Sequence, residues 1–105
     1  MAMLQDAATT GNGTAENIAG LGHEHCVYVQ WASGVTAGVV SIETARLKDY
    51  TGTWAVIATA NYNAAATDIY EFGGAYKWIR ARITTTVAGG SAPSVTVESI
   101  HNTAW

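Results

Sequence analysis

The longest alternating stretch of the chain is AYKWIRARITTTV, residues 75–87. Successive side chains of a β-strand point to opposite faces of a sheet. One predicted face therefore carries Lys77, Ile79, Ala81 and Ile83, and the other carries Tyr76, Trp78, Arg80, Arg82 and Thr84. An apolar face backed by an aromatic and cationic face is typical of a strand with one side buried in a core.

Alternation of the same kind recurs before and after this strand. Further strands are expected at about residues 3–9, 14–19, 23–32, 37–45, 53–61, 67–72 and 95–101. Glycine and polar clusters separate them at short, regular intervals, which is typical of sandwiches and barrels. The sequence predicts one all-β domain over residues 1–105, a two-layer antiparallel β-sandwich of about eight strands, either jelly-roll or immunoglobulin-like.

Two parts of this fold prediction concern individual segments. Gly11-Asn12-Gly13 predicts a hairpin turn between the first two strands, because these residues tolerate positive φ. Residues 1–13 are expected either to stay in the sandwich or to form an N-terminal arm that reaches a neighbour. Trp54, Val56 and Ala58 are expected on one face, and we interpret both Trp31 and Trp54 as core residues.

The composition restricts the possible partners. Only 12% of the residues are charged and 49% are hydrophobic, whereas about 25% charge is usual for a soluble domain. Because charged residues are depleted from interface centres, we favour a surface covered in an assembly over a lightly charged monomer. The net charge of −3 and the absence of a Lys/Arg run argue against nucleic acid as a partner.

The targeting signals and the cysteine count add further expectations. A single cysteine, Cys26, excludes an intrachain disulfide. The chain has no apolar stretch of membrane-spanning length, and its first residues do not resemble a signal peptide. We therefore expect no membrane partner, and synthesis and assembly in the cytosol.

The segment His23-Glu24-His25-Cys26 is the strongest candidate for chemistry. His23 and His25 share a face, but a metal site needs more ligands, and nothing in the sequence places His101 beside them. We interpret the segment as a polar strand start at a solvated edge. Cys26 lacks an evident activating base, and a neighbouring carboxylate such as Glu24 raises a thiol pKa, so a half-buried structural cysteine is expected.

No other constellation predicts catalysis. The remaining acids are scattered, and no Ser-His-Asp arrangement or phosphate-binding glycine loop is evident. We predict that the chain is not an enzyme and uses no cofactor or metal.

Aromatic and arginine side chains instead suggest a protein interface. These types are enriched at binding hot spots. The candidate interface residues are Tyr76, Trp78, Arg80, Arg82 and the terminal Trp105. The alternative is an intramolecular ladder, in which Arg80 and Arg82 pair with acids such as Glu43, Asp68 or Glu98. Four tryptophans also leave open a sugar-stacking platform.

An ordered series of short motifs extends over most of the chain. They are TGNGT at 10–14, VYVQ at 27–30, GTWAVI at 52–57, GAYKWIRARI at 74–83 and SVTV at 94–97. In this series the chain resembles small β-sandwich virion structural proteins of tailed bacteriophages, in which G-x-W-x-x-L and Y-x-[WY]-[IV]-R-A-R-[IV] strands recur. His23–His25 and the Arg46–Tyr50 loop depart from the pattern and are expected to mark a partner-specific surface.

The resemblance implies a capsid decoration or cement protein. Such a protein would be made in the host cytoplasm, bind the major capsid protein on the assembled head, and stabilise it from the capsid surface. A homo-oligomer is expected, with a trimer favoured. The alternatives are a neck, tail or fibre-base virion protein, or a carbohydrate-binding module for host attachment.

Overall fold

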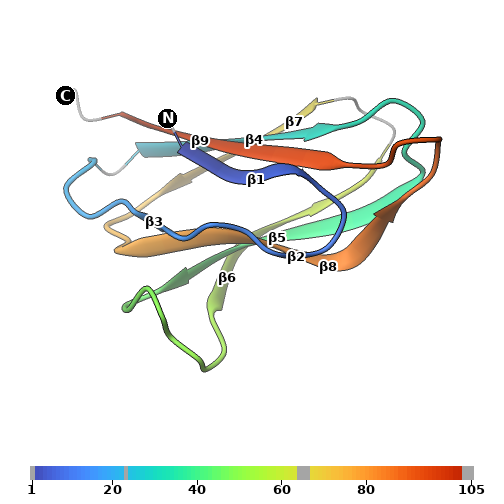
Figure 1. Ribbon diagram of the computed structural model, residues 1–105. Coiled ribbons are helices and arrows are strands. Elements are labelled where there is room, and N and C mark those ends of the chain that lie inside the picture. Colours follow the sequence, from blue (N-terminus) through green and yellow to red (C-terminus); the bar gives the residue numbers. More distant parts are fainter. Residues whose placement is uncertain (1, 23, 64–66, 103–105) are drawn as a thin grey trace.

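The computed structural model describes residues 2–22, 24–63 and 67–102, and over these residues it is a β-sandwich of two antiparallel sheets (Figure 1). The predicted all-β, two-layer architecture is confirmed. Its strands are β1 (Ala2–Ala8), β2 (Gly11–Asn12), β3 (Glu16–Asn17), β4 (Glu24–Trp31), β5 (Ala37–Ala45), β6 (Ala55–Asn61), β7 (Thr67–Gly73), β8 (Trp78–Ala88) and β9 (Val95–Asn102).

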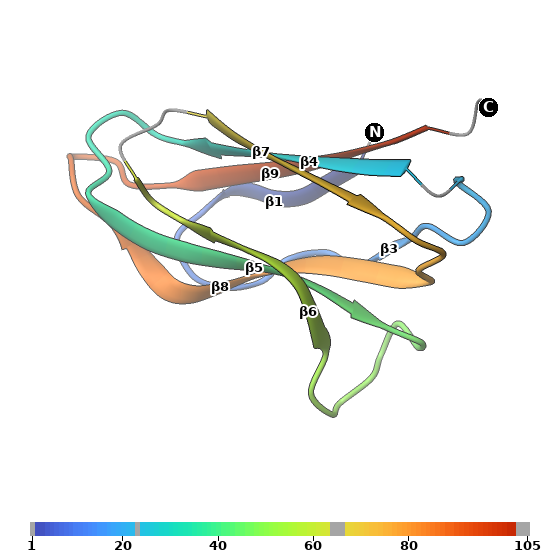
Figure 2. The ribbon, with the colours of Figure 1, turned by 180° about the vertical axis from the view of Figure 1, so that it is seen from behind.

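The two sheets divide these strands unequally. Sheet A has the order β1-β9-β4-β7, and sheet B has the order β2-β8-β5-β6, with β3 pairing the same strand β8 as β2. The upper layer of Figure 1 is sheet A and the lower layer is sheet B, and Figure 2 shows β6 and β7 from the other side. The sandwich measures 40 × 32 × 17 Å, so it is a thin slab with two broad faces.

The core fills the space between the sheets, as the alternation predicts. Val27, Val29 and Trp31 of β4 are at most 4% exposed, and their neighbours Val95 and Val97 are completely buried. The opposite layer contributes, among others, Ile42, Ile79, Ala81 and Ile83. The inward facing of residues 79, 81 and 83 is therefore confirmed.

The N-terminal segment does not form the predicted hairpin. β1 pairs with β9 in sheet A, whereas β2 pairs with β8 in sheet B, so the chain crosses between layers at this point. Gln5 is 5% exposed and fastens the crossing, because its Nε2 donates to the carbonyl oxygens of Gly11 (3.0 Å) and Ala81 (2.8 Å). The described part of 1–13 thus packs within the sandwich and does not leave it as an arm.

Gly13 is the residue that permits this crossing. Its N–H donates to the carbonyl of Ala81 at 2.8 Å, and the next N–H, of Thr14, donates to the carbonyl of Leu4 at 3.1 Å. A Cβ at position 13 would overlap the Leu4 carbonyl oxygen. Glycine is therefore required at position 13 because two backbone segments approach closely there, and not because the chain makes a hairpin turn.

Strand β6 also differs from the prediction. Val56 is 58% exposed, whereas Ala60 is completely buried and Ala58 packs against the core. The pairing of β5 with β6 shifts register between Ile42 and Glu43, and such a bulge breaks strict alternation. The predicted common face of Trp54, Val56 and Ala58 is therefore wrong.

No helix long and apolar enough to cross a membrane occurs in the described part of the chain.

Candidate protein-interaction surfaces

The outer face of sheet B carries three of the predicted interface residues, Trp78, Arg80 and Arg82, in alternate positions of β8. Between the arginines and β6 lies Glu43 of β5, which is 1% exposed. Its Oε1 accepts from Arg80 Nε and its Oε2 accepts from Arg82 Nε, each at 3.0 Å. The two guanidinium groups thus balance the charge of a buried carboxylate. This is the intramolecular ladder that the sequence left open as an alternative, and Glu43 is its acid.

Trp54 closes this arrangement from outside. Its ring lies 4.2 Å from the Arg80 guanidinium carbon, and its Nε1 donates to the carbonyl of Tyr50 at 3.0 Å. Trp54 is 4% exposed, so its expected burial is confirmed. It is buried against Arg80 and lies outside the cluster between the sheets.

The other two predicted interface residues do not join this face. Tyr76 precedes β8, which begins at Trp78, and its half-buried ring packs against the core. Its ring centroid lies 5.6 Å from that of Phe72 and 6.2 Å from that of His25. The prediction that Tyr76 shares a face with Trp78, Arg80 and Arg82 is therefore wrong. Side chains alternate only within β8, and Tyr76 precedes it. Trp105 lies outside the described residues.

A buried polar network closes one end of the sandwich. His25 of β4 stands directly opposite His101 of β9, and their Nδ1 atoms are 2.7 Å apart. His25 Nε2 lies 2.9 Å from the carbonyl oxygen of Gly74, and His101 Nε2 lies 3.1 Å from Glu16 Oε1. Ser99 Oγ donates to the same Glu16 oxygen. The expectation of a solvated edge at His25 is wrong, since this residue is 4% exposed.

Hydrogen-bond polarity places one proton of this network. The Gly74 carbonyl can only accept, so His25 Nε2 carries hydrogen and donates to it. Between the two Nδ1 atoms, one ring donates and the other accepts. The network thus joins the two imidazoles to each other and to partners on both layers.

This cluster is not arranged as a metal centre. Within the described ranges, no group of three or more His, Cys, Asp and Glu side chains is placed to hold a metal ion. His23, the other half of the proposed histidine pair, lies outside those ranges. Nothing in the sequence revealed the partnership of His25 with His101, because their 76-residue separation is bridged only by strand register.

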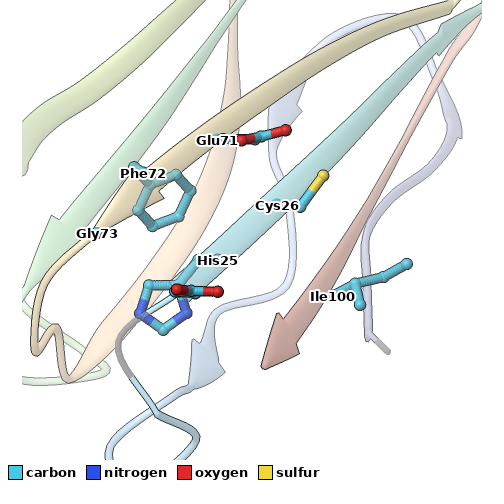
Figure 3. A pocket seen from close by; sticks show the side chains of 7 residues that line it. His25, Cys26, Glu71, Phe72, Gly73 and Ile100 are labelled. Carbon is cyan, nitrogen blue, oxygen red and sulfur yellow. The ribbon is translucent and has the colours of Figure 1, made fainter. Parts of the chain in front are cut away.

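A shallow hollow of about 570 Å³ lies on sheet A beside this network (Figure 3). Cys26 of β4 stands between Glu71 of β7 and Ile100 of β9 in the strand register. Glu24, His25, Phe72 and Gly73 complete the lining. Exposed apolar side chains continue across the same face, with Tyr28 at 39%, Ile69 at 55% and Ile100 at 41%.

The thiol in this hollow is not activated. Partial burial raises the pKa of Cys26 above its usual value, and the Glu71 carboxylate raises it further. The half-exposed position expected for this cysteine is confirmed, although Glu71 and not Glu24 is the carboxylate that acts on it. A thiolate nucleophile needs the opposite electrostatic environment.

The connection between β5 and β6 forms a second prominent feature, residues 46–54, which we call the knob. It projects from sheet B on the side away from sheet A (Figure 1). Leu47 and Tyr50 are exposed by 48% and 46%, with Arg46 and Lys48 beside them in the chain. Lys48 Nζ also lies 5.9 Å from the Trp78 ring centroid.

Charge is divided between the two faces. Alternation along β4 and β7 places Glu24 and Glu71 on the outer face of sheet A. Glu98 lies on the same face, because its neighbours in β9, Val97 and Ser99, are buried on the inner face. The sheet B side carries Arg46, Lys48, Arg80 and Arg82 together with Asp49 and the buried Glu43. The molecule therefore has an acidic, partly apolar face and a basic, partly apolar face on opposite sides of the slab.

The comparisons with known proteins add no family to this description: no protein-family model matches the chain, and no curated protein sequence matches it.

Proposed function

We propose that this chain is a structural subunit of a larger protein assembly, and specifically a virion protein of the head-decoration type. The observation that carries the proposal is the pair of broad outer faces, which combine exposed apolar side chains with net charges of opposite sign. Protein interfaces combine apolar contact with complementary charge in this way.

The dimensions of the slab support the same function. A face of 40 × 32 Å is larger than the roughly 800 Å² that each partner contributes to a standard interface. A subunit that binds only an assembled shell stabilises that shell by mass action, and many copies add their contributions. The proposed shell partner is the major capsid protein, on the resemblance of the strand motifs to tailed-phage virion proteins.

The candidate reactive groups support a non-catalytic role. The Glu43 carboxylate is bonded to two guanidinium groups, and the raised pKa of Cys26 disfavours its thiolate. His25 and His101 are bonded to each other and to partners within the fold. These polar groups hold the structure together, which is the role that we propose for them.

A neck, tail or fibre-base protein is the nearest alternative, because the same motifs support it equally. A sugar-binding platform has less support, since Trp31 and Trp54 are each 4% exposed and Lys48 lies over Trp78. We retain decoration as the leading proposal on the strength of the two large faces.

Quantitative mass spectrometry of purified particles from the producing culture tests the proposal. Decoration predicts a copy number comparable to that of the major capsid protein, whereas a neck or tail role predicts only one or a few rings of copies. Absence of the chain from the particles, combined with no co-sedimentation of the purified chain with empty shells, would contradict a virion role.

A further inference from the structure

We propose that the knob of one copy binds the hollow on sheet A of a second copy. The inference rests on the proposed assembly function and names a partner for one of its faces. The partner is this same chain, and the contact joins two different surfaces. Such a heterologous contact builds rings or open stacks rather than a symmetric pair.

The knob is held in shape by its own bonds. The Tyr50 N–H donates to the Leu47 carbonyl at 3.3 Å, and the Tyr50 carbonyl accepts from Trp54 Nε1 at 3.0 Å. Gly52 leaves room for the Tyr50 ring, which a Cβ at that position would overlap. Because Leu47 and Tyr50 are displayed on a preformed turn, little ordering entropy is lost when they bind.

The hollow offers matching chemistry. Its apolar lining comes from Ile100 and Phe72, with the neutral thiol of Cys26 between the strands. Glu24 and Glu71 stand in the same lining. The knob carries Arg46 and Lys48 against the single acid Asp49, so apolar contact and opposite charge coincide.

Charge complementarity selects a second copy as the occupant. All five Lys and Arg residues of the chain belong to the knob, to β8 or to the residue before β8, and none belongs to a strand of sheet A. The knob projects from sheet B away from sheet A (Figure 1), whereas strands of sheet A line the hollow, so a molecule cannot fill its own hollow. Only another molecule can bring the two together.

Sedimentation velocity over a range of concentrations tests this contact with two variants. Leu47→Glu places a carboxylate on the knob, and Glu71→Lys reverses the charge of the hollow. We expect the wild-type chain to self-associate and each variant alone to raise the dissociation constant at least about tenfold. A mixture of the two variants should regain association as a dimer, because one contributes an intact hollow and the other an intact knob.

Matched controls separate this contact from general effects of charge or folding. Thr86→Glu and Thr67→Lys introduce the same charged side chains at exposed positions outside the knob and the hollow, and should associate like the wild type. Thermal unfolding should show that all variants remain folded. A wild-type chain that stays monomeric, or a mixture of variants that fails to associate, would overturn the inference. Binding of that monomer to shells would leave the proposed decoration function intact.

Discussion

Glu43 shows how one buried charge organises a surface. The carboxylate is 1% exposed on the outer side of sheet B, where no second layer of sheet covers it. Arg80 and Arg82 supply its hydrogen bonds, and Trp54 stacks on Arg80. Burial of an unpaired carboxylate would be costly, so these side chains form one unit.

Replacement of Glu43 should therefore lower the free energy of unfolding far more than replacement of the exposed Arg82. Glu43→Gln leaves the mostly buried Arg80 without its counter-ion, and we expect a loss of about 3 kcal/mol in the free energy of unfolding. Arg82→Gln should cost less than about 1 kcal/mol, because the Arg82 side chain is 44% exposed. Urea denaturation measures both values, and equal losses would argue against Glu43 as the centre of the unit.

Cys26 gives a second prediction at this scale. Its pKa is raised by burial and then by Glu71, so at any pH near neutrality less thiolate is present than in a free cysteine. Alkylation by iodoacetamide should be slower in the folded chain than in the urea-unfolded chain. Glu71→Gln removes the second cause and should increase the folded-state rate by a factor of about 2–5. A rate that is unchanged or lower in this variant would contradict the electrostatic assignment.

At the scale of elements, β8 was the most predictable strand and β1–β2 the least. The alternation of Ile79, Ala81 and Ile83 against Arg80 and Arg82 survives in the fold without a change of face. By contrast, Gly11-Asn12-Gly13 has the composition of a hairpin turn, but Gly11 and Asn12 form β2, which lies in the other sheet from β1. Turn composition describes local dihedral freedom, whereas strand pairing depends on distant partners.

The crossing predicts different costs for two glycines. Gly13→Ala should destabilise the chain by about 3 kcal/mol, because the new Cβ meets the backbone of Leu4. Gly20→Ala should cost about 1–2 kcal/mol, since position 20 has open space and only a positive φ of 83° to strain an alanine. Thermal or urea unfolding of both variants shows which one loses more stability. If the backbone angle φ alone controlled the loss, Gly20→Ala would be the less stable variant.

At the scale of the whole molecule, the histidine network joins the two layers at one end. Its members come from β4 and β9 of sheet A, from β3 of sheet B, and from the turn that follows β7. The core joins the layers by apolar contact and imposes little directionality, whereas this network fixes their positions through directional bonds.

Removal of one imidazole should loosen this junction. His101→Leu leaves buried His25 Nδ1 without its partner and removes one of the bonds to Glu16, which keeps the bond from Ser99 Oγ. One buried unsatisfied group costs about 1–3 kcal/mol. Nitrogen-detected NMR of the wild-type side chains should show a protonated His25 Nε2, because this atom faces the Gly74 carbonyl oxygen. Ile100→Leu, an adjacent exposed substitution, should leave both stability and this signal unchanged. A wild-type His25 with no hydrogen on Nε2 would contradict the bond to the Gly74 carbonyl.

The sequence by itself determined the all-β class, the approximate strands and the two faces of β8, because side-chain alternation is a local property of an extended chain. It also indicated that Arg80 and Arg82 face outward and that Cys26 is not activated. Only the tertiary structure decided that Glu43 is their counter-ion, that His25 meets His101, and that acidic and basic faces lie on opposite sides. Those facts depend on strand register and on layer assignment, which residues distant in sequence set together through packing.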